Sequence, residues 1–389
     1  MSPLEIVTRH ALRLGFSMVG VAPAGPLPTW QRFDDWLDEG YAGALDYLAR
    51  RREERRDVRS VWPGARSVVV LTLDYRAAGV VRPEVLPPNR GIVSSYAWGE
   101  DYHRWCSRRL DELLEAVRAE LGPEVEGRGY VDTGPILERD LARQAGLGWF
   151  GKNTMLIHPQ HGSWFFIAEL LLSIELPPTP TRVPDRCGRC TRCLVACPTK
   201  AFAGPYVLDA RRCISYLTVE LKGSIPRSLR PLVGGHIFGC DICQEVCPWN
   251  RKASETELEA FRPRPDLLAP DLIALVRLMP EEFRARFAGS PILRAKRRGL
   301  LRNVAVALGN VGNGEAIPPL LEAISDPEPL VREHAGWALM RRAGKEAVDA
   351  LAAAIDRESD EHTREDLLLS LEEARRGSHP KTAFPPTSA

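Results

Sequence analysis

Eight of the nine cysteines fall between positions 187 and 247, and their spacing is typical of iron–sulfur chemistry. The first four, Cys187, Cys190, Cys193 and Cys197, precede Pro198 and match the Cys-x2-Cys-x2-Cys-x3-Cys-Pro pattern of bacterial two-cluster ferredoxins at every interval. In that pattern the first three thiolates surround one 4Fe-4S cluster, and the fourth ligates the other cluster. The run therefore predicts a second, complementary set of cysteines.

The second set, Cys240, Cys243 and Cys247, has one cysteine fewer than the first. Ile237 stands where a further cysteine is expected, and Cys213 is the available substitute. We therefore predict two 4Fe-4S clusters. The first is held by Cys187, Cys190, Cys193 and Cys247, and the second by Cys197, Cys213, Cys240 and Cys243.

Two other uses of the cysteines are weighed against the clusters. Structural zinc bound by Cys-x2-Cys pairs is the main alternative, although zinc loops rarely carry three cysteines at successive intervals of three. A disulfide framework is not expected in a long chain without an export signal. Cys106, beside Trp105, is expected to be a buried small hydrophobe rather than a nucleophile.

Length and composition indicate a globular protein of two or three domains. The chain has 389 residues, 44% of them hydrophobic, and its formal net charge of +1 excludes a polybasic or strongly acidic disordered protein. Charged residues near the start leave no signal peptide, so a cytoplasmic location is expected. The longest apolar stretch, residues 164–176, contains Glu169 and Glu175 and is too short to span a membrane.

Hydrophobic patterns outline the domains. Residues 4–15 and 105–121 have helical periodicity, whereas 67–74 and 162–176 are typical of strands. We expect an α/β (α+β) domain over 1–180, a ferredoxin-like domain over 181–252 and an all-helical domain over 263–376. The tail, 377–389, is expected to be disordered.

The helical region contains a repeat of 31 residues. Residues 304–308 match 335–339, and Ala316 and Leu320 match Ala347 and Leu351. This pattern indicates paired helices of the HEAT type. Two such units cannot bury themselves alone, so we expect them to pack on the catalytic body or on the preceding stretch, 268–287.

Two basic stretches are candidates for binding RNA phosphates, with solvated helix faces as the alternative. One comprises Arg50, Arg51, Arg52, Arg55 and Arg56. The other comprises Arg284, Arg286, Arg294, Lys296, Arg297, Arg298 and Arg302.

Asp132 is the leading candidate for acid–base chemistry. It follows a predicted strand end at 129–131 and precedes a Thr-Gly-Pro turn, a common place for catalytic groups. In a poorly solvated pocket its pKa would rise and it would hold a proton for transfer. The alternative is that Asp132 caps a helix beginning near Ile136. Arg139 and Arg143 share one face of that helix and could bind phosphates or face solvent.

The segment 148–154 combines glycines, exposed amides and a lysine, which suits binding of an amide or a phosphate. The aromatic residues Trp149, Phe150, Trp164 and Phe165 could underlie a flat macrocycle, but from the residues alone we favour a core role.

Taken together, several motifs resemble the epoxyqueuosine reductase family over nearly the whole chain. They are residues 95–103, 131–139, 148–154, 162–166 and 239–250, together with the cysteine clusters and the helical repeat. The resemblance implies reduction of epoxyqueuosine to queuosine at the wobble position of tRNA anticodons, the last step of queuosine biosynthesis. It also implies a cobalamin-binding first domain similar to part of the reductive dehalogenases.

The resemblance further assigns residues and partners. Asp132 would be the proton donor. Cobalamin would contact Arg56, Tyr96, Asp132, Arg139, Gly151, Lys152, Asn153, Thr154, Gly162, Ser163 and Asp241. No Asp-x-His-x-x-Gly string supplies a lower axial ligand, so His103, His158 and His161 have no assigned role. The partners would be tRNA carrying epoxyqueuosine and an external one-electron donor such as a flavodoxin or ferredoxin; no membrane partner is expected.

Two other functions remain as alternatives. A corrinoid reductive dehalogenase would be expected to have an export signal and no helical repeat. A dicluster electron-transfer subunit, with the repeats as its docking surface, would bind iron and sulfur without cobalt.

Overall fold

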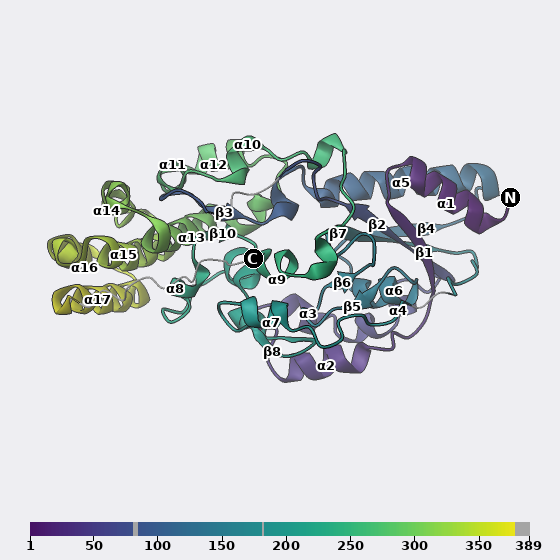
Figure 1. Ribbon diagram of the computed structural model, residues 1–389, viewed down its shortest axis with the longest axis horizontal. Coiled ribbons are helices and arrows are strands. Elements are labelled where there is room, and N and C mark those ends of the chain that lie inside the picture. Colours follow the sequence, from purple (N-terminus) through teal and green to yellow (C-terminus); the bar gives the residue numbers. More distant parts are fainter. Residues whose placement is uncertain (81–84, 181–182, 378–389) are drawn as a thin grey trace. The chain divides into compact units, whose positions relative to one another are not determined.

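The computed structural model describes residues 1–80, 85–180 and 183–377 (Figure 1). The chain forms two compact units whose segments alternate along the sequence. The first comprises Met1–Gly79, Gly99–Arg211 and Ile242–Arg262, and the second Val80–Trp98, Arg212–Asp241 and the chain from Pro263. The three-domain boundaries drawn from the sequence stay predictions, and the predicted tail lies outside the described residues from position 378 on.

The helices and strands of the first unit are mostly short. They are α1 (Pro3–Arg13), β1 (Met18–Pro23), α2 (Trp30–Asp38), α3 (Asp46–Arg50), α4 (Val58–Val61), β2 (Ser67–Asp74), α5 (Tyr102–Leu121), β4 (Gly127–Tyr130), α6 (Glu138–Gln144), β5 (Trp149–Phe150), β6 (Leu156–Ile157), β7 (Phe165–Leu172), α7 (Arg192–Ala196), β8 (Phe202–Gly204), β9 (Val207–Leu208) and α9 (Ile242–Glu245).

A four-stranded sheet forms the framework of this unit. The strand order is β1-β2-β7-β4, and every neighbouring pair is antiparallel. The predicted layering of helices and strands is therefore present as an α+β arrangement without parallel crossovers, because alternation of patterns along a chain does not fix strand direction. All eight residues of β2 are buried, since helices cover both faces of the sheet.

Helices α1 and α5 pack on one face of the sheet and α6 on the other (Figure 1). Local signals set their ends. Ser2 and Glu5 form a capping box at α1. Asp101 accepts the backbone N–H of His103 and thereby starts α5 three residues before the predicted position. This cap also fixes the position of the Tyr102 and His103 side chains at the start of the helix.

The second unit is mainly helical. Its elements are β3 (Ile92–Val93), α8 (Arg230–Val233), β10 (His236–Phe238), α10 (Pro265–Leu268), α11 (Leu272–Val276), α12 (Pro280–Arg286), α13 (Lys296–Val311), α14 (Ile317–Ala323), α15 (Pro329–Ala343), α16 (Val348–Arg357) and α17 (Glu361–Arg376). Strands β3 and β10 pair in parallel, which joins segments about 140 residues apart in the sequence. Among the described residues, no helix is long and apolar enough to cross a membrane.

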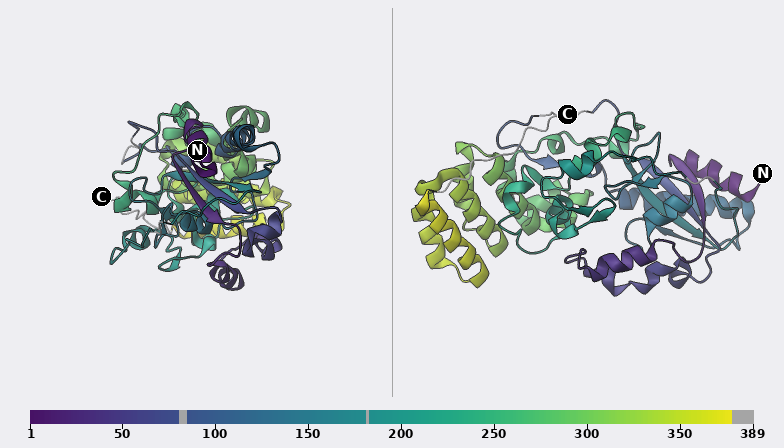
Figure 2. Two further views of the ribbon diagram at one scale, coloured as in Figure 1. Left: turned by 90° about the vertical axis from the view of Figure 1, so that its right-hand side faces the viewer. Right: turned by 60° about the horizontal axis from the view of Figure 1, so that its bottom comes forward.

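The predicted helical repeat is confirmed. Helices α13 and α15 are the equivalent long helices, and α14 and α16 are their shorter partners, with α17 completing the stack (Figure 2). Gly309 allows a close approach, because a Cβ there would lie 2.7 Å from the Trp337 ring and 3.1 Å from Ala338. As predicted, the repeat packs on the preceding helical stretch, through contacts of α11 with α13 and α14.

Most arginines of the second basic stretch are engaged within the protein. Arg302 is 1% exposed and donates to the carbonyls of Leu217, Leu221 and Gly223. It therefore cannot contact RNA phosphates, and this part of the prediction is wrong. The other paired members are Arg284, Arg286, Arg294 and Arg297, which bind Glu281, Asp266, Glu220 and Asp326.

Candidate active site and cluster pocket

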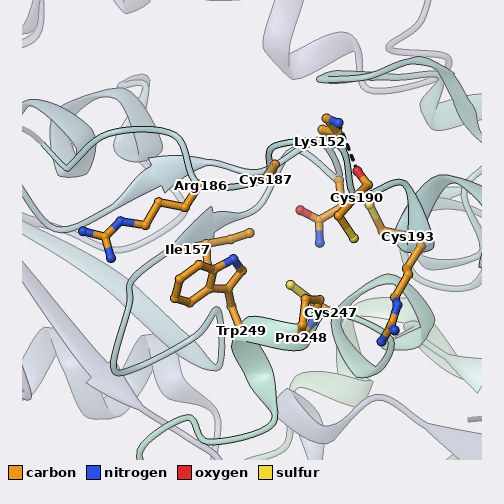
Figure 3. A pocket seen from close by; sticks show the side chains of 11 residues that line it. Lys152, Ile157, Arg186, Cys187, Cys190, Cys193, Cys247, Pro248 and Trp249 are labelled. Carbon is orange, nitrogen blue, oxygen red and sulfur yellow. Dashed lines mark hydrogen bonds between the residues drawn. The ribbon is translucent and has the colours of Figure 1, made fainter.

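Four thiols line one pocket in the first unit (Figure 3). Cys187 and Cys190 lie in the loop before α7, which we call the ligand loop. Cys193 lies on α7, and Cys247 follows α9. The first three are half-buried and Cys247 is buried. These are the four residues predicted to hold the first cluster.

The chemistry of this donor set fits a metal cluster. Burial and repulsion from the other three thiols raise the pKa of Cys193 to about 11. Four thiolates can share such a pocket only if a cationic centre compensates their charge. Within the described residues, no three His, Cys, Asp or Glu side chains are arranged to hold a single metal ion. The thiols instead surround a cavity of about 60 Å³.

Lys152 fixes the ligand loop. Its ammonium group donates to the carbonyl oxygen of Gly188 at 2.6 Å. It also donates to the carbonyl oxygen of Cys190 at 3.0 Å (Figure 3). Asp185 accepts the backbone N–H of Cys187 at 2.7 Å. Lys152, which is predicted to contact cobalamin, therefore uses two of its three N–H donors to bind the ligand loop.

The remaining four cysteines belong to both units. Cys197 and Cys243 lie in the first unit, and Cys213 and Cys240 in the second. Their predicted role as ligands of the second cluster stays a prediction.

Asp132 projects from the loop after β4, as predicted. Its backbone is in the left-handed region with φ of 57°, which is uncommon for a residue with a side chain. The carboxylate accepts a hydrogen bond from the Tyr102 hydroxyl at 2.8 Å and lies 3.4 Å from Nε2 of His103. Tyr102 in turn stacks on Phe166 of β7, with ring centroids 4.1 Å apart. The strained loop thus presents the carboxylate to two groups at the start of α5.

His103 lies between two carboxylates. Its Nδ1 is 2.8 Å from Oδ1 of Asp101, and its Nε2 faces Asp132. Burial opposes the charged imidazole, but hydrogen bonds and attraction from Asp101 and Asp132 outweigh it and raise the pKa of His103 to about 9. At neutral pH the ring is therefore an imidazolium beside Asp132. Sequence reasoning left this histidine without a role.

Two further acids lie close to this group. Glu138 accepts the backbone N–H of Asp132, and burial together with repulsion from Asp132 raises the pKa of Glu138 to about 8. Glu169 on β7 is fully buried, pairs in register with Tyr130, and has no hydrogen-bond partner for either carboxyl oxygen among the described residues. Burial raises the pKa of Glu169 well above its usual range. In both acids, burial therefore favours the neutral form of the carboxyl.

These contacts correct two expectations about Asp132. Its side chain is 62% exposed, so the protein alone does not desolvate it; desolvation acts on Glu138 and Glu169 instead. Asp132 does not cap α6 either, because the N-cap position is Leu137 and no side chain caps the helix. The loop between strand and helix is simply longer than the sequence pattern indicated.

The turn between β5 and β6 links Asp132 to the cluster pocket. Arg139, the residue after Glu138, donates to the carbonyl oxygen of Thr154. Arg143 lies over the Phe150 ring at 5.4 Å, so both arginines of α6 reach the β5–β6 hairpin; the predicted common face is present, but this contact with the hairpin was not predicted. Lys152 in the same turn holds the ligand loop.

Gly151 and Asn153 shape this turn. A Cβ at Gly151 would lie 2.4 Å from the end of the Ile157 side chain, so a larger residue there would force Ile157 to move. Asn153 is 3% exposed and donates to the carbonyl of Cys243 at 3.3 Å.

Gly162 and Ser163 lie against the segment that follows Cys247. The Ser163 N–H donates to Oδ1 of Asn250 at 2.7 Å, and its hydroxyl contacts Asn250 and Gln244. A Cβ at Gly162, where φ is 60°, would lie 2.1 Å from the same Asn250 oxygen. These contacts give both residues a structural role, and their predicted contact with cobalamin stays a prediction. The network itself was not foreseen.

The other predicted cobalamin contacts, Arg56, Tyr96 and Asp241, come from both units, and their role stays a prediction. Arg56 is exposed and lies over the Trp30 ring at 5.1 Å in the first unit. Tyr96 and Asp241 belong to the second unit, where buried Asp241 accepts hydrogen bonds from Ser94 and from the backbone of Ser95.

The preference for aromatic core residues is confirmed for Trp149, Trp164 and Phe165, which are at most 8% exposed. Cys106 is fully buried, and burial raises the pKa of its thiol to about 12. In the first basic stretch, Arg51 and Arg52 pair with acids and Arg55 is buried, whereas Arg50 and Arg56 are exposed.

Three family models match the chain. Residues 55–133 match the one described as "Epoxyqueuosine reductase QueG, DUF1730", residues 186–250 match the 4Fe-4S double cluster binding domain, and residues 291–372 match HEAT repeats.

Relatives and solved structures agree with these matches. An epoxyqueuosine reductase from Pseudomonas aeruginosa is 45% identical over 333 residues, which cover 84% of this chain and 91% of that protein. One from Escherichia coli is 42% identical over 337 residues, with coverages of 86% and 88%. The fold is similar to a crystal structure of epoxyqueuosine reductase with an epoxyqueuosine-modified tRNA stem loop. The TM-score is 0.89, the identity 30%, and the coverage 96% of this chain and 98% of that one.

Proposed function

The chain belongs to the epoxyqueuosine reductase family, and we propose that it reduces epoxyqueuosine to queuosine in the anticodon of tRNA. Removing the epoxide oxygen consumes two electrons and two protons and leaves a carbon–carbon double bond and water. The electrons come from an external one-electron donor and pass through two 4Fe-4S clusters. The protein must also supply protons at the opening ring.

The residues present fit the cofactors of this reaction. The four thiols of the pocket have the number, exposure and mutual repulsion that a cluster requires. Cys197, Cys213, Cys240 and Cys243 would hold the second cluster. For cobalamin, the exposed polar side chains of Asp132, Arg139 and Arg56 are suited to a large polar macrocycle. When bound, cobalamin supplies the reducing metal centre that acts on the epoxide.

The Asp132 group supplies the acid. The imidazolium of His103 carries a proton at neutral pH and faces Asp132, and the Tyr102 hydroxyl fixes the same carboxylate oxygen. A proton passed from this group to the epoxide oxygen neutralises the charge that develops as the ring opens. Glu138 holds the backbone of Asp132 and keeps the loop in this position.

We place the RNA contact on the second unit. Of its basic stretch, Lys296 and Arg298 remain exposed, and Lys222 lies close enough to Arg294 and Lys296 to interact with them. Burial and these neighbouring cations lower the pKa of Lys222. A group of close cations at the start of α13 is suited to an RNA backbone, and binding there should weaken steeply with salt.

One observation carries the proposal: a continuous set of contacts joins the proton donor to the cluster pocket. Glu138 holds Asp132, Arg139 binds Thr154, and Lys152 binds the ligand loop. The same unit therefore positions an acid and an electron-transfer site through one short turn. A plain electron carrier has no need of the acid.

The test is conversion of the modified nucleoside. The anaerobically reconstituted protein is incubated with tRNA bearing epoxyqueuosine and a strong chemical reductant, and the nucleosides are analysed. We expect queuosine from the native protein. Asp132→Asn should lose activity while keeping its iron and its corrinoid absorption. Unchanged nucleoside with the fully loaded native protein would refute the proposal.

The two alternatives give different results in the same preparation. An electron-transfer subunit would take up iron without cobalamin. A reductive dehalogenase would consume a halogenated substrate and leave the tRNA unchanged.

A further inference from the structure

The ligand loop of the first cluster lies on an exposed, strongly cationic face. We call residues 185–207 the ligand-loop face. Its three cluster cysteines are half-buried, so the pocket they line lies near the surface. Arg189 and Arg192 lie between these cysteines in the sequence and are exposed. Arg186 directly precedes Cys187.

The charge of this face is much larger than that of the whole chain. It carries four cations, namely three arginines and Lys200, against the single carboxylate of Asp185, whereas all 389 residues sum to +1. Asp185 is engaged by the Tyr206 hydroxyl and by the backbone of Cys187. Among the described residues, none of the three arginines forms an ion pair, in contrast to the paired arginines of the basic stretches.

Exposed apolar residues occur on the same face as the cations. Val195 on α7 is 81% exposed, and Tyr206 and Val207 are 41% and 37% exposed. Arg192 and Val195 are three residues apart on α7 and therefore lie on the same side of the helix. Exposed apolar groups with a charged rim are the usual composition of a protein interface.

We propose that the ligand-loop face is the docking site of an acidic one-electron carrier protein, such as a flavodoxin. The inference rests on the proposed function, which requires two electrons from outside. Each docking event oxidises the carrier by one electron, so two successive events supply both. Carriers of this kind bind transiently through small interfaces steered by opposite charge.

Two other roles for the arginines are possible on chemical grounds and give different results. A bound cluster with four thiolates is anionic, so nearby arginines also offset its charge. Arg186 and Arg192 line the pocket, whereas Arg189 does not line it. Arg189 is thus free to serve a partner alone. RNA is the other anionic candidate: Tyr206 is one exposed ring on which a base could stack, whereas Val195 and Val207 offer no flat surface.

The test uses a flavodoxin of net negative charge with the fully loaded enzyme. Binding of the oxidised flavodoxin is measured by calorimetry at low and high salt. We expect Arg189→Glu combined with Arg192→Glu to raise Kd by about tenfold or more at low salt, and the difference to shrink at high salt because the charges are screened. Arg189→Glu alone should show a smaller effect of the same sign. Arg13→Glu reverses the charge of an exposed arginine on α1 and serves as the matched control. It should leave Kd unchanged.

Activity and spectroscopy complete the experiment. Conversion driven by limiting flavodoxin should slow in Arg189→Glu, a change outside the pocket lining, while conversion driven by titanium(III) citrate and the paramagnetic resonance of the reduced clusters stay unchanged. Equal slowing with both reductants would overturn the proposal in favour of a role toward the cluster. A loss of affinity for the tRNA stem loop with unchanged flavodoxin binding would overturn it in favour of RNA.

Failure of the proposed function is separable from failure of this inference. If the native enzyme leaves epoxyqueuosine unchanged with the chemical reductant, the function is wrong whatever binds the face. If the native enzyme works but shows no salt-dependent flavodoxin binding, the docking inference is wrong.

Discussion

His103 offers the sharpest test of the acid group at Asp132. The change is His103→Gln, which keeps a hydrogen-bonding side chain of similar reach and removes the imidazolium. Raising a pKa from 6.5 to about 9 corresponds to about 3 kcal/mol of preference for the charged ring. Because the side chain is 33% exposed, solvent screening reduces the part that contributes to stability to roughly 1–2 kcal/mol.

The direction of the pH dependence follows from the raised pKa. A histidine whose pKa rises on folding contributes its full stabilisation below about pH 6.5 and loses it as the pH rises through about 9. The native protein should therefore be more stable than the variant at pH 7, and the two should converge near pH 10. Denaturant unfolding at both pH values measures this difference.

The effect on turnover should be larger than the effect on stability. Loss of a positioned proton donor typically lowers the chemical step by about 10²-fold or more. We expect single-turnover conversion by His103→Gln to slow by that order while affinity for the tRNA stem loop is retained. Native turnover should fall as the pH rises through about 9. We call this fall the alkaline limb of the pH profile, and the variant should lack it.

Two further variants keep the result interpretable. Tyr102→Phe removes one hydrogen bond to Asp132 but leaves the imidazolium, so it should slow turnover less and retain the alkaline limb. His362→Gln changes an exposed histidine of the second unit and should behave as the native protein. If His103→Gln, with normal iron and corrinoid content, shows the native rate and pH profile, the assignment of the proton to this group is wrong.

Three other predictions test separate parts of the structure. Cys193→Ser should lose one cluster's iron, measured by metal analysis, whereas Cys106→Ala should keep the full content because that thiol is buried away from the pocket. Arg230→Met should destabilise the second unit by about 3–5 kcal/mol in denaturant unfolding, since it removes the buried cation that pairs with Glu333 and leaves Asp366 with Arg227 alone. Glu169→Gln should change stability little near pH 5 and increase it near pH 8, because a carboxyl with a raised pKa destabilises the native state once the unfolded chain ionises; equal pH dependence in the two proteins would contradict a neutral Glu169.

Local signals explain what the sequence predicted well. The strand over 67–74 matches β2 at both ends, because a Pro-Gly turn precedes a continuous β-branched run. Three of the four pocket thiols are close in sequence, so their spacing alone defines a loop around a common centre. The repeat was detectable because each helix pair uses the same small and apolar residues.

Long-range pairing explains what the sequence could not predict. The meeting of Asp132 with Tyr102 and His103 depends on β4 lying beside β7 and on α5 packing against both strands. No local pattern encodes that order, and two hydrophobic strands can pair in several antiparallel arrangements. The sequence therefore identified Asp132 by its place after a strand but gave no partner for it.

Glu169 shows how strongly the reading of a residue depends on this pairing. In the sequence it interrupts an apolar stretch and counts as a charge that argues against a membrane span. In the fold it is fully buried on β7, where burial, Glu138 and Asp132 all raise its pKa. Burying a carboxyl without a hydrogen-bond partner costs stability, on the order of 1–3 kcal/mol even when it is neutral. A fold that needed only a sheet core would gain by placing leucine there, as it does at the neighbouring positions 170–172. The strained loop at Asp132 departs in the same way from what stability alone favours, and both features lie at the proposed proton donor.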